Sequence, residues 1–514
     1  MDWILLGSFL LAYCVGANEV GVNVREGPAE ILVVDAGTQR GIPGAELETT
    51  HNLVFVTDNA GRVAFWEPGL MGKEIFFSIR CHGYEIPQQS FGIRGAKVVP
   101  KAGEVATISL KRIQPAERLC RLTGEGRFRD TLLLGRKVPD FARENQGMVA
   151  GQDSVQAIEY KGKLRWFWGD TLKLSHPLGL FQTAGATTPF LGEDFDPSQG
   201  IPFRYFTDRD GFTRAMMPYT KQPGRLVWVF SLCVVQDVKG NERLLAHYTV
   251  RKNLATEYEH GVAVYNDELN IFEAVTSLPL VETWRIPNGH PIVWEDGGVK
   301  WLLMGSPTPG VRVAATYEAV IDPKQYEAFS CADGMKDGKP TGPKLDDSGR
   351  PVWRWSKYLP PIDSPTEAKW VKEGKIRPED ARLCPVDVEG VEKDRIMLHS
   401  GTVRWNKHRQ RWVLVSSQTW GKPSFLGEVW YAEAKSPLGP FAKAARIVTH
   451  EKQTFYNVCH HPFLDRENGK MIHFEGTYSN EFSGNPWKTP RYNYNQILYR
   501  VDLDGGVIGK ARVE

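Results

Sequence analysis

Apolar and polar residues alternate with a period of two along most of this chain, and that period is typical of β-strands. In residues 151–171 an alternating run from Val155 to Tyr160 is followed by a Lys161-Gly162-Lys163 turn and an aromatic run, Leu164-Arg165-Trp166-Phe167-Trp168. Two such runs joined by a short turn predict a β-hairpin, which folds the two ends of the segment back onto each other.

Four further units of this kind follow the hairpin. Each combines an opening strand, an aromatic or apolar second strand and outer strands, and they begin near residues 225, 289, 398 and 459. Five four-stranded units without alternating helices predict a five-bladed β-propeller over residues 147–514. Residues 322–395, rich in Pro, Lys and Asp, interrupt the third or fourth unit, and we expect them to form a surface excursion over one face.

The N-terminal part of the chain shows shorter strands. Over residues 20–113, alternating runs are separated by Gly-, Asn- and Asp-rich turns, which predicts a small β-sandwich. Residues 114–146 are too apolar for a flexible linker, so we expect a connector that packs against both neighbours. The predicted fold class is therefore all-β, with an N-terminal β-sandwich followed by a five-bladed β-propeller.

Residues 1–17 are apolar and end in Val15-Gly16-Ala17, small residues that fit a signal-peptidase site before Asn18. The usual positive n-region is missing, because Asp2 is the only charge. We expect a signal peptide and export to the periplasm or medium. No later stretch reaches the ~18 apolar residues of a membrane span. The cysteines after the leader show no CxxC spacing, which excludes a zinc ribbon and leaves any disulfide pairing open.

Length and composition narrow the classes of function. A chain of 514 residues suggests two or three domains. The formal net charge of +2 and the lack of a Lys/Arg run argue against a nucleic-acid partner. The 16 tryptophans are many, and flat aromatic faces stack on sugar rings, although most of them are expected in the core of a large β protein.

The hairpin places two carboxylates, Asp153 and Asp170, near the same end of its strands. Two carboxylates held close cannot both ionise freely, which gives a site an acid and a base from one residue type. The alternative is structural: Asp153 caps a turn and Asp170 closes the Gly-Asp-Thr turn. Spacing alone leaves both interpretations open.

The opening strand of each propeller blade lines the central channel, so residues on these strands converge. Here the opening strands offer Asp153 and four histidines: His290, His399, His460 and His461. A single histidine is usually structural, but the same placement in three units indicates a shared polar centre. That centre would bind sugar hydroxyls or, with Asp153, a Ca²⁺ ion, although Ca²⁺ prefers oxygen ligands. Glu428 and Glu475 are candidate acids for the same rim.

Two resemblances follow from these motifs. The order D…T…GIPGA…TD..GRV.F…GY in residues 20–113 resembles the carboxypeptidase regulatory-like sandwich module. Asp153 with Trp-Phe-Trp-Gly-Asp-Thr, the Glu428 strand closed by Ser-Pro-Leu-Gly-Pro-Phe, and Phe-Glu-Gly-Thr-Tyr at 474–478 resemble five-bladed propeller glycosidases. These are the arabinanases and xylosidases of glycoside hydrolase family 43 and, more closely, the bacterial endo-D-arabinanase-type propellers.

The resemblance implies an exported glycoside hydrolase that acts on a polysaccharide or oligosaccharide. It implies Asp153 as base, Asp170 as a second carboxylate and a glutamate as acid, whose identity stays open because the family-43 Glu-Gly-Pro setting is absent. We expect Trp168 and Arg404 to join the histidines in binding substrate.

Two alternatives remain: a polysaccharide lyase that uses His or Tyr as base with Arg285, Arg404 or Arg491 neutralising a uronate, and a non-catalytic carbohydrate- or protein-binding propeller. The sugar, its linkage, endo or exo action, stereochemical outcome and oligomeric state stay open.

Overall fold

The computed structural model describes residues 27–176, 179–221, 224–280 and 283–514, so the predicted signal peptide at 1–17 lies outside the described residues. The described elements are mainly strands, which confirms the all-β class. The α-helices are short: α1 (Arg129–Leu133), α2 (Tyr317–Ile321), α3 (Ser364–Lys372) and α4 (Gly506–Lys510). Among the described residues, no helix is long and apolar enough to cross a lipid bilayer.

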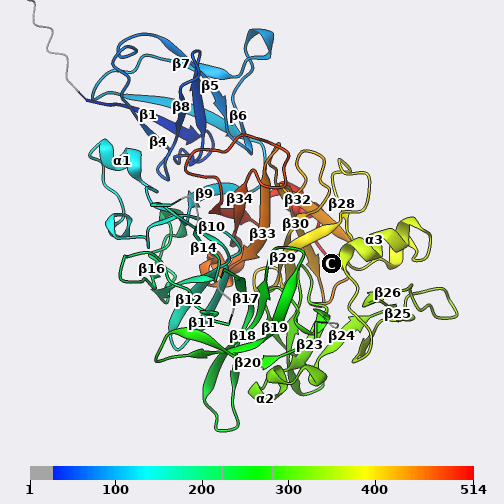
Figure 1. The fold of residues 1–514 in the computed structure, drawn as a ribbon. Coiled ribbons are helices and arrows are strands. Elements are labelled where there is room, and N and C mark those ends of the chain that lie inside the picture. Colours follow the sequence, from blue (N-terminus) through cyan, green and yellow to red (C-terminus); the bar gives the residue numbers. More distant parts are fainter. Residues whose placement is uncertain (1–26, 177–178, 222–223, 281–282) are drawn as a thin grey trace, which may run out of the picture.

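The N-terminal unit, blue in Figure 1, contains two four-stranded sheets with the orders β4-β1-β8-β6 and β3-β2-β5-β7. Alternate residues of these strands, such as Ile31 and Val33 in β1 and Phe77 in β5, are fully buried in one core that both sheets share. The bounds are β1 (Ala29–Asp35), β2 (Glu46–Thr49), β3 (Val54–Val56), β4 (Arg62–Phe65), β5 (Ile75–Arg80), β6 (Tyr84–Glu85), β7 (Gly95–Val98) and β8 (Val105–Arg112).

Five larger sheets follow, and each corresponds to one unit seen in the sequence. The first sheet contains β11 (Gln156–Tyr160), β12 (Lys163–Trp168), β15 (Ala184–Pro189) and β16 (Arg204–Tyr205). The second contains β17 (Leu226–Gln236), β18 (Glu242–Arg251), β19 (Glu257–Asn266) and β20 (Ile271–Ser277). The third contains β21 (Ile292–Asp296), β22 (Val299–Met304), β23 (Val311–Ala314), β24 (Glu327–Ser330) and β27 (Arg354–Ser356). Neighbouring strands within these sheets are antiparallel, and the aromatic β12 is buried from Leu164 to Trp168 because it lies inside its sheet.

The fourth and fifth sheets complete the series. The fourth contains β29 (Leu398–Asn406), β30 (Arg411–Gln418), β31 (Val429–Ala434), β32 (Lys443–Val448) and β28 (Val386–Asp387). The fifth contains β33 (Thr454–His460), β34 (Met471–Ser479), β35 (Asn495–Asp502) and β9 (Glu117–Arg121). Smaller pairings join β10 (Val149–Gln152), β13 (Thr171–Lys173) and β14 (Gly179–Leu180), and separately β25 (Met335–Lys336) and β26 (Lys339–Pro340).

Residues 322–395 differ in part from the predicted surface excursion. Two of their strands, β24 and β27, extend the third sheet, and β28 pairs in parallel with β32 of the fourth. The segment also has a small core of its own around Trp370, Ile362 and Cys331. The apolar residues scattered through a polar stretch explain the difference, because they bury themselves between two sheets.

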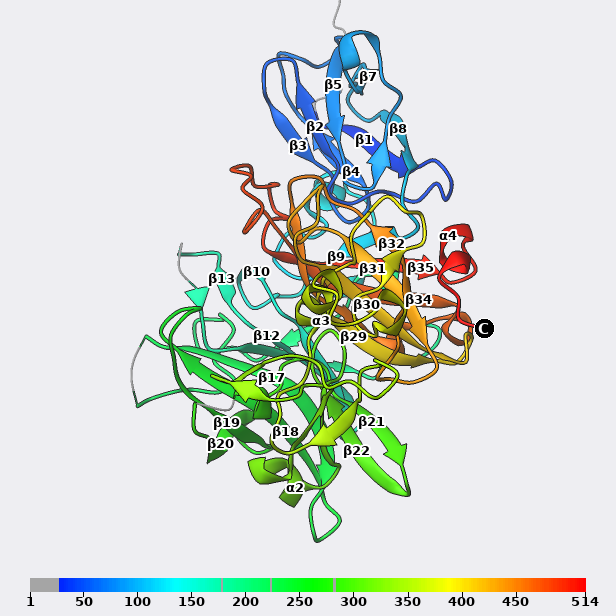
Figure 2. The same ribbon diagram turned by 90° about the vertical axis from the view of Figure 1, so that its right-hand side faces the viewer.

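The outer strand of the fifth sheet comes from the N-terminal side of the chain. Strand β9 pairs antiparallel with β35, with Leu498 opposite Cys120 and Arg500 opposite Glu117. In Figures 1 and 2 the cyan β9 lies among the orange and red strands. Sequence analysis assigned these residues to the connector 114–146, whereas all five residues of β9 are buried in a sheet. The first and last parts of the chain are thereby joined.

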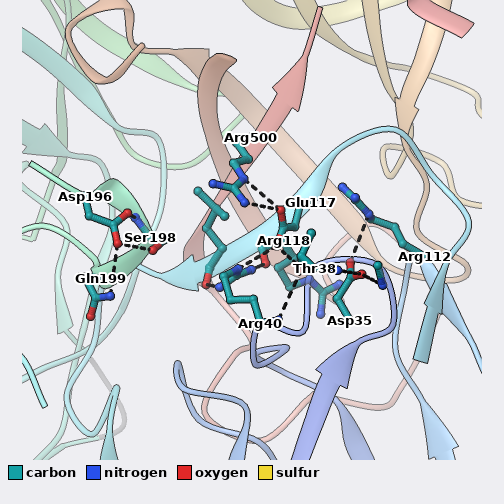
Figure 3. Close-up of polar contacts among 12 residues, drawn as sticks. Asp35, Thr38, Arg40, Arg112, Glu117, Arg118, Asp196, Ser198, Gln199 and Arg500 are labelled. Carbon is teal, nitrogen blue, oxygen red and sulfur yellow. Dashed lines mark hydrogen bonds and ion pairs between the residues drawn. The ribbon is translucent and has the colours of Figure 1, made fainter. Parts of the chain in front are cut away.

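Glu117 at the start of β9 links three parts of the molecule, as Figure 3 shows. Its carboxylate accepts from Arg40 Nε of the N-terminal unit at 2.7 Å and from Arg500 Nε of β35 at 2.9 Å. Burial alone would raise the pKa of Glu117, but the two guanidinium groups hold it below its usual range. The carboxylate therefore stays charged and bridges the N-terminal unit to the last sheet.

We expect Glu117→Gln to lower the free energy of unfolding by about 1.5–3 kcal/mol at neutral pH, because it removes charge-assisted hydrogen bonds from a buried acceptor. A depressed carboxyl pKa stabilises the folded state above the unfolded pKa and loses that contribution as pH falls through the folded value. The deficit of the variant relative to wild type should therefore shrink in acid, as measured by chemical denaturation at several pH values.

The matched control is Glu74→Gln, which removes one partner of an exposed ion pair with Lys97. That variant should change stability by less than about 1 kcal/mol. Equal stability of Glu117→Gln and wild type at neutral pH would show that the bridge does not hold the two ends of the chain together.

Candidate functional site

A cavity of about 1080 Å³ lies where the opening segments of the five larger sheets meet. Each sheet contributes one segment to its wall: residues 153–156, 228–230, 288–290, 399–401 and 456–458. Strands β29 and β33, and likewise β11 and β17, contact each other directly beside it. Side chains that are hundreds of residues apart in sequence are thus brought to one volume.

The β11–β12 hairpin holds Asp153 and Asp170 side by side in this cavity. The backbone N–H of Asp170 donates to Asp153 Oδ1 at 2.9 Å, and the N–H of Asp153 donates to the carbonyl of Asp170 at 3.2 Å. Gly169 fits between them because a Cβ there would lie 2.5 Å from Asp153 Oδ1. Both residues therefore line the cavity from the open end of one hairpin, where their backbones are paired.

The surroundings of the two aspartates differ. Asp153 Oδ2 accepts from Tyr456 Oη at 3.2 Å, and Tyr494 also bonds to this carboxylate. Asp170 Oδ1 accepts from Trp228 Nε1 at 2.8 Å. Burial, and next the charge of Asp170, raise the pKa of Asp153 to about 7, whereas burial raises the pKa of Asp170. The two carboxyl groups titrate as a pair, and together they hold a proton more readily than isolated aspartates do.

A third carboxylate that sequence analysis did not select, Glu481, also lines the cavity. It follows β34 in a loop, and burial together with the charge of Asp170 raises its pKa. Glu257 lines the same cavity, but Thr249 donates to it and Arg251 pairs with it, which occupies its oxygens. Glu481 lies in an irregular segment without strand periodicity, so no pattern in the sequence marks it.

The predicted acids Glu428 and Glu475 lie outside the cavity lining, which differs from the expected convergence at its rim. Glu428 is 1 % exposed, accepts from Arg446 at 3.1 Å and Thr449 at 2.9 Å, and burial raises its pKa to about 7. Glu475 is also 1 % exposed and accepts from His461 Nε2 at 2.7 Å. Both side chains are therefore buried among their own hydrogen-bonding partners and away from the cavity.

The predicted substrate-binding residues divide into two groups. His290 and His399 line the cavity. The others do not: His460 pairs with Asp465, His461 with Glu475, Trp168 stacks on Tyr205 in the core, and Arg404 donates to the backbone carbonyl of His290. The split follows position along the chain: His290 and His399 belong to the opening segments 288–290 and 399–401 that line the cavity, whereas His460 and His461 lie beyond the lining segment 456–458.

The predicted Ca²⁺ ion does not fit the groups at this centre. The side chains nearest His290 offer sulfur and nitrogen, with Cys459 Sγ 3.6 Å from His290 Nδ1, whereas Ca²⁺ requires oxygen ligands. The oxygens of Asp153 already accept from Tyr456 and the Asp170 N–H. Within the described ranges, no group of three or more His, Cys, Asp or Glu side chains is placed to hold a metal ion.

The rest of the wall combines flat aromatic rings with amides and cations. Its rings include Trp228, Phe230, Phe425 and Phe482, and Phe482 is 56 % exposed. Its polar groups include Asn288, Asn457, Asn493, Lys252 and Lys488. Aromatic faces beside hydrogen-bonding side chains suit a ligand that has both an apolar face and many hydroxyl groups.

No family model matches the chain, and no curated protein matches it. Among solved structures, the chain is similar to a "GH43_1 enzyme from Xanthomonas citri complexed with xylotriose", with 12% identity over 70% of this chain and 90% of the other, at a TM-score of 0.34. An "Exo-1,5-alpha-L-arabinanase from Bovine Ruminal Metagenomic Library" shares 11% identity over 71% of this chain and 98% of the other, at 0.34.

A third similar structure is a mutant of "alpha-l-arabinofuranosidase arb93a from fusarium graminearum", with 10% identity over 76% of this chain and 99% of the other, at a TM-score of 0.33. TM-scores of this size do not establish a shared fold or activity. The site geometry is therefore the ground for a functional assignment.

Proposed function

We propose that the chain is an exported glycoside hydrolase, in which an N-terminal β-sandwich precedes a five-bladed β-propeller and the active site lies at the propeller axis. The observation that carries this proposal is the Asp153–Asp170 pair, held at the open end of one hairpin on the wall of an aromatic-lined cavity. Paired carboxylates of unequal proton affinity supply the acid and the base that glycosidic bond cleavage needs. The substrate would be a polysaccharide or oligosaccharide.

In the proposed reaction Asp153 carries the proton. Its pKa of about 7, set by burial and by the charge of Asp170, keeps it protonated at and below neutral pH, so it donates to the leaving glycosidic oxygen. Asp170, which accepts from Trp228 Nε1, acts in its ionised form, either as the nucleophile toward the sugar or as a base toward water. This reverses the role of base that the family resemblance implies for Asp153.

Glu481 is the remaining carboxylate within the same cavity. The charge of Asp170 contributes to its raised pKa, which places the two groups within electrostatic reach of each other. We assign Glu481 to the orientation of water or of a sugar hydroxyl. The buried glutamates Glu428 and Glu475 have no part in proton transfer to substrate, because neither lines the cavity.

A polysaccharide lyase is the second candidate, favoured by Lys252 and Lys488 on the cavity wall and by Tyr456 beside Asp153. The arginines first considered for a uronate are engaged elsewhere: Arg491 pairs with Asp130, and Arg285 donates to backbone carbonyls. A lyase releases an unsaturated uronate, so the ultraviolet absorbance of the products separates it from a hydrolase, which releases only saturated sugars.

We expect Asp153→Asn and Asp170→Asn each to reduce turnover of a glycan substrate by about 10²-fold or more, because each removes a group that acts in the transition state. An aryl glycoside with an activated leaving group should restore the turnover of Asp153→Asn, because such a group leaves without a proton from an acid. Azide should restore the turnover of Asp170→Asn and yield a glycosyl azide. Product analysis by mass spectrometry checks both rescues.

The matched control is Asp346→Asn, a surface aspartate of the 322–395 segment that makes an ion pair with Arg350. It should leave turnover unchanged. Retained turnover in both Asp153→Asn and Asp170→Asn would contradict the proposal. Glycan binding without turnover in the wild type would identify a non-catalytic binding protein.

The pH profile should follow the proton on Asp153. Activity that depends on protonated Asp153 falls as pH rises through about 7, the value to which burial and the charge of Asp170 raise its pKa. Asp170→Asn removes that charge, so the pKa of Asp153 falls and the alkaline limb of the azide-rescued rate moves to lower pH. An unmoved limb would show that another group supplies the proton.

We expect Phe482→Ala to raise KM for long oligosaccharides by about threefold to tenfold while leaving kcat nearly unchanged. Phe482 packs on Tyr456 with ring centroids 6.1 Å apart and offers an exposed face to a bound chain. Trp66→Ala, a 47 % exposed ring in the N-terminal unit, is the control. Equal KM values in the wild type and Phe482→Ala would show that this ring does not contribute to substrate binding.

A further inference from the structure

Four ionisable side chains form a continuous line from the interior to the cavity wall: Glu475, His461, Cys459 and His290. Glu475 Oε1 lies 2.7 Å from His461 Nε2, His461 Nδ1 lies 3.7 Å from Cys459 Sγ, and Cys459 Sγ lies 3.6 Å from His290 Nδ1. The first three side chains are 1 to 2 % exposed, and only His290 lines the cavity. The line connects a buried carboxylate to the substrate site.

Two distributions of protons satisfy these contacts with the Nδ1–H of His290 directed at sulfur. In one, the Cys459 thiol donates to His461 Nδ1; in the other, His461 is an imidazolium that donates to both Glu475 and a Cys459 thiolate. In both, the sulfur accepts from the Nδ1–H of His290. They differ in the position of one proton, between sulfur and nitrogen, so the charges around the pair decide which distribution holds.

The surrounding charges favour the thiolate. The Glu475 carboxylate stabilises a proton on His461, and its Oε2 has no hydrogen-bond partner among the described residues. Arg404 of β29 interacts electrostatically with Cys459 and donates to the backbone carbonyl of His290 at 3.0 Å. Trp166 and Phe463 pack on the His461 ring and keep water away, which strengthens these interactions.

We propose that Cys459 is a thiolate and a positioning residue: it accepts the Nδ1–H of His290 and so fixes the His290 ring and its tautomer, with Nε2 as the acceptor for a hydroxyl group of the bound sugar. The acceptor role of His290 rests on the proposed function, whereas the charge state of Cys459 does not. Because Nδ1 is engaged by sulfur, Nε2 is the ring nitrogen that remains for a ligand.

The titration behaviour of the cysteines agrees with this geometry. Burial raises the pKa of Cys459, but His290 and His461 more than offset it and hold that pKa well below its usual value. The pKa of His461 is raised to about 10, because Cys459 and Glu475 outweigh its burial. Burial instead raises the pKa of Cys81 to about 11 and of Cys120, Cys233 and Cys331 to about 12, and it also raises the pKa of Cys384.

The test is an ultraviolet difference spectrum of the folded protein at neutral pH, since a thiolate absorbs where a thiol does not. Wild type minus Cys459→Ser should show a thiolate signal, and wild type minus Cys233→Ser should show none. Glu475→Gln should weaken the signal, because the loss of the carboxylate charge raises the pKa of the thiol through His461. Absence of the signal in the Cys459→Ser difference would overturn the thiolate.

If Cys459→Ser fails to fold, the absorbance of the wild type alone tests the thiolate. Its thiolate absorbance should persist from neutral pH into mild acid and disappear on unfolding, whereas thiols of ordinary or raised pKa give no signal there. Absence of the thiolate absorbance from the folded wild type at neutral pH would equally overturn the proposal.

Sugar affinity tests the positioning role separately. In the Asp153→Asn background, calorimetry with an oligosaccharide should show binding at least about tenfold weaker for Cys459→Ser and for His290→Phe, as expected for the loss of a hydrogen-bond acceptor in a fixed position. Unchanged affinity in both variants would overturn the positioning role while the spectrum still decides the thiolate. Absence of glycan binding and turnover in the wild type would overturn the proposed function and the acceptor role of His290, leaving the thiolate intact.

Discussion

The pairing of β9 with β35 is the constraint on which the rest of the structure depends. A strand that follows the N-terminal unit completes the last sheet, and the buried Glu117 joins Arg40 to Arg500 across that junction. Because the cavity is walled by segments of all five larger sheets, its shape requires the first and last sheets to stay in contact. Asp153 of the first sheet and Tyr456 of the fifth meet only under that condition.

The site combines two kinds of electrostatic arrangement at short range. Asp153 and Asp170 bring like charges together, which raises the proton affinity of one of them. The line from Glu475 to His290 instead alternates acidic side chains with imidazole rings, so each group has a hydrogen-bonding partner in the interior. The first arrangement suits proton transfer, whereas the second suits a fixed orientation of groups. Both are supported by strands, so little rearrangement is needed when a ligand binds.

The features that could be predicted from the sequence are those that depend on residues close together in the chain. The hairpin with Asp153 and Asp170 could be predicted because turn spacing alone brings its two ends together. Glu481 could not, since its loop is placed by contacts with distant strands, and Glu428 was misplaced because the start of a strand does not reveal which neighbour it faces. Strand β9 looked like connector, because its partner lies nearly 400 residues later in the chain.

The late arrival of that partner has a consequence for biosynthesis. Residues 117–121 leave the ribosome long before residues 495–502, so the nascent chain carries a β-strand segment without its partner, and the apolar Leu119 and Cys120 stay unburied by it until translation is almost complete. Unpaired strands of this kind invite intermolecular association. Truncation before residue 495 would therefore leave this segment permanently without its partner strand.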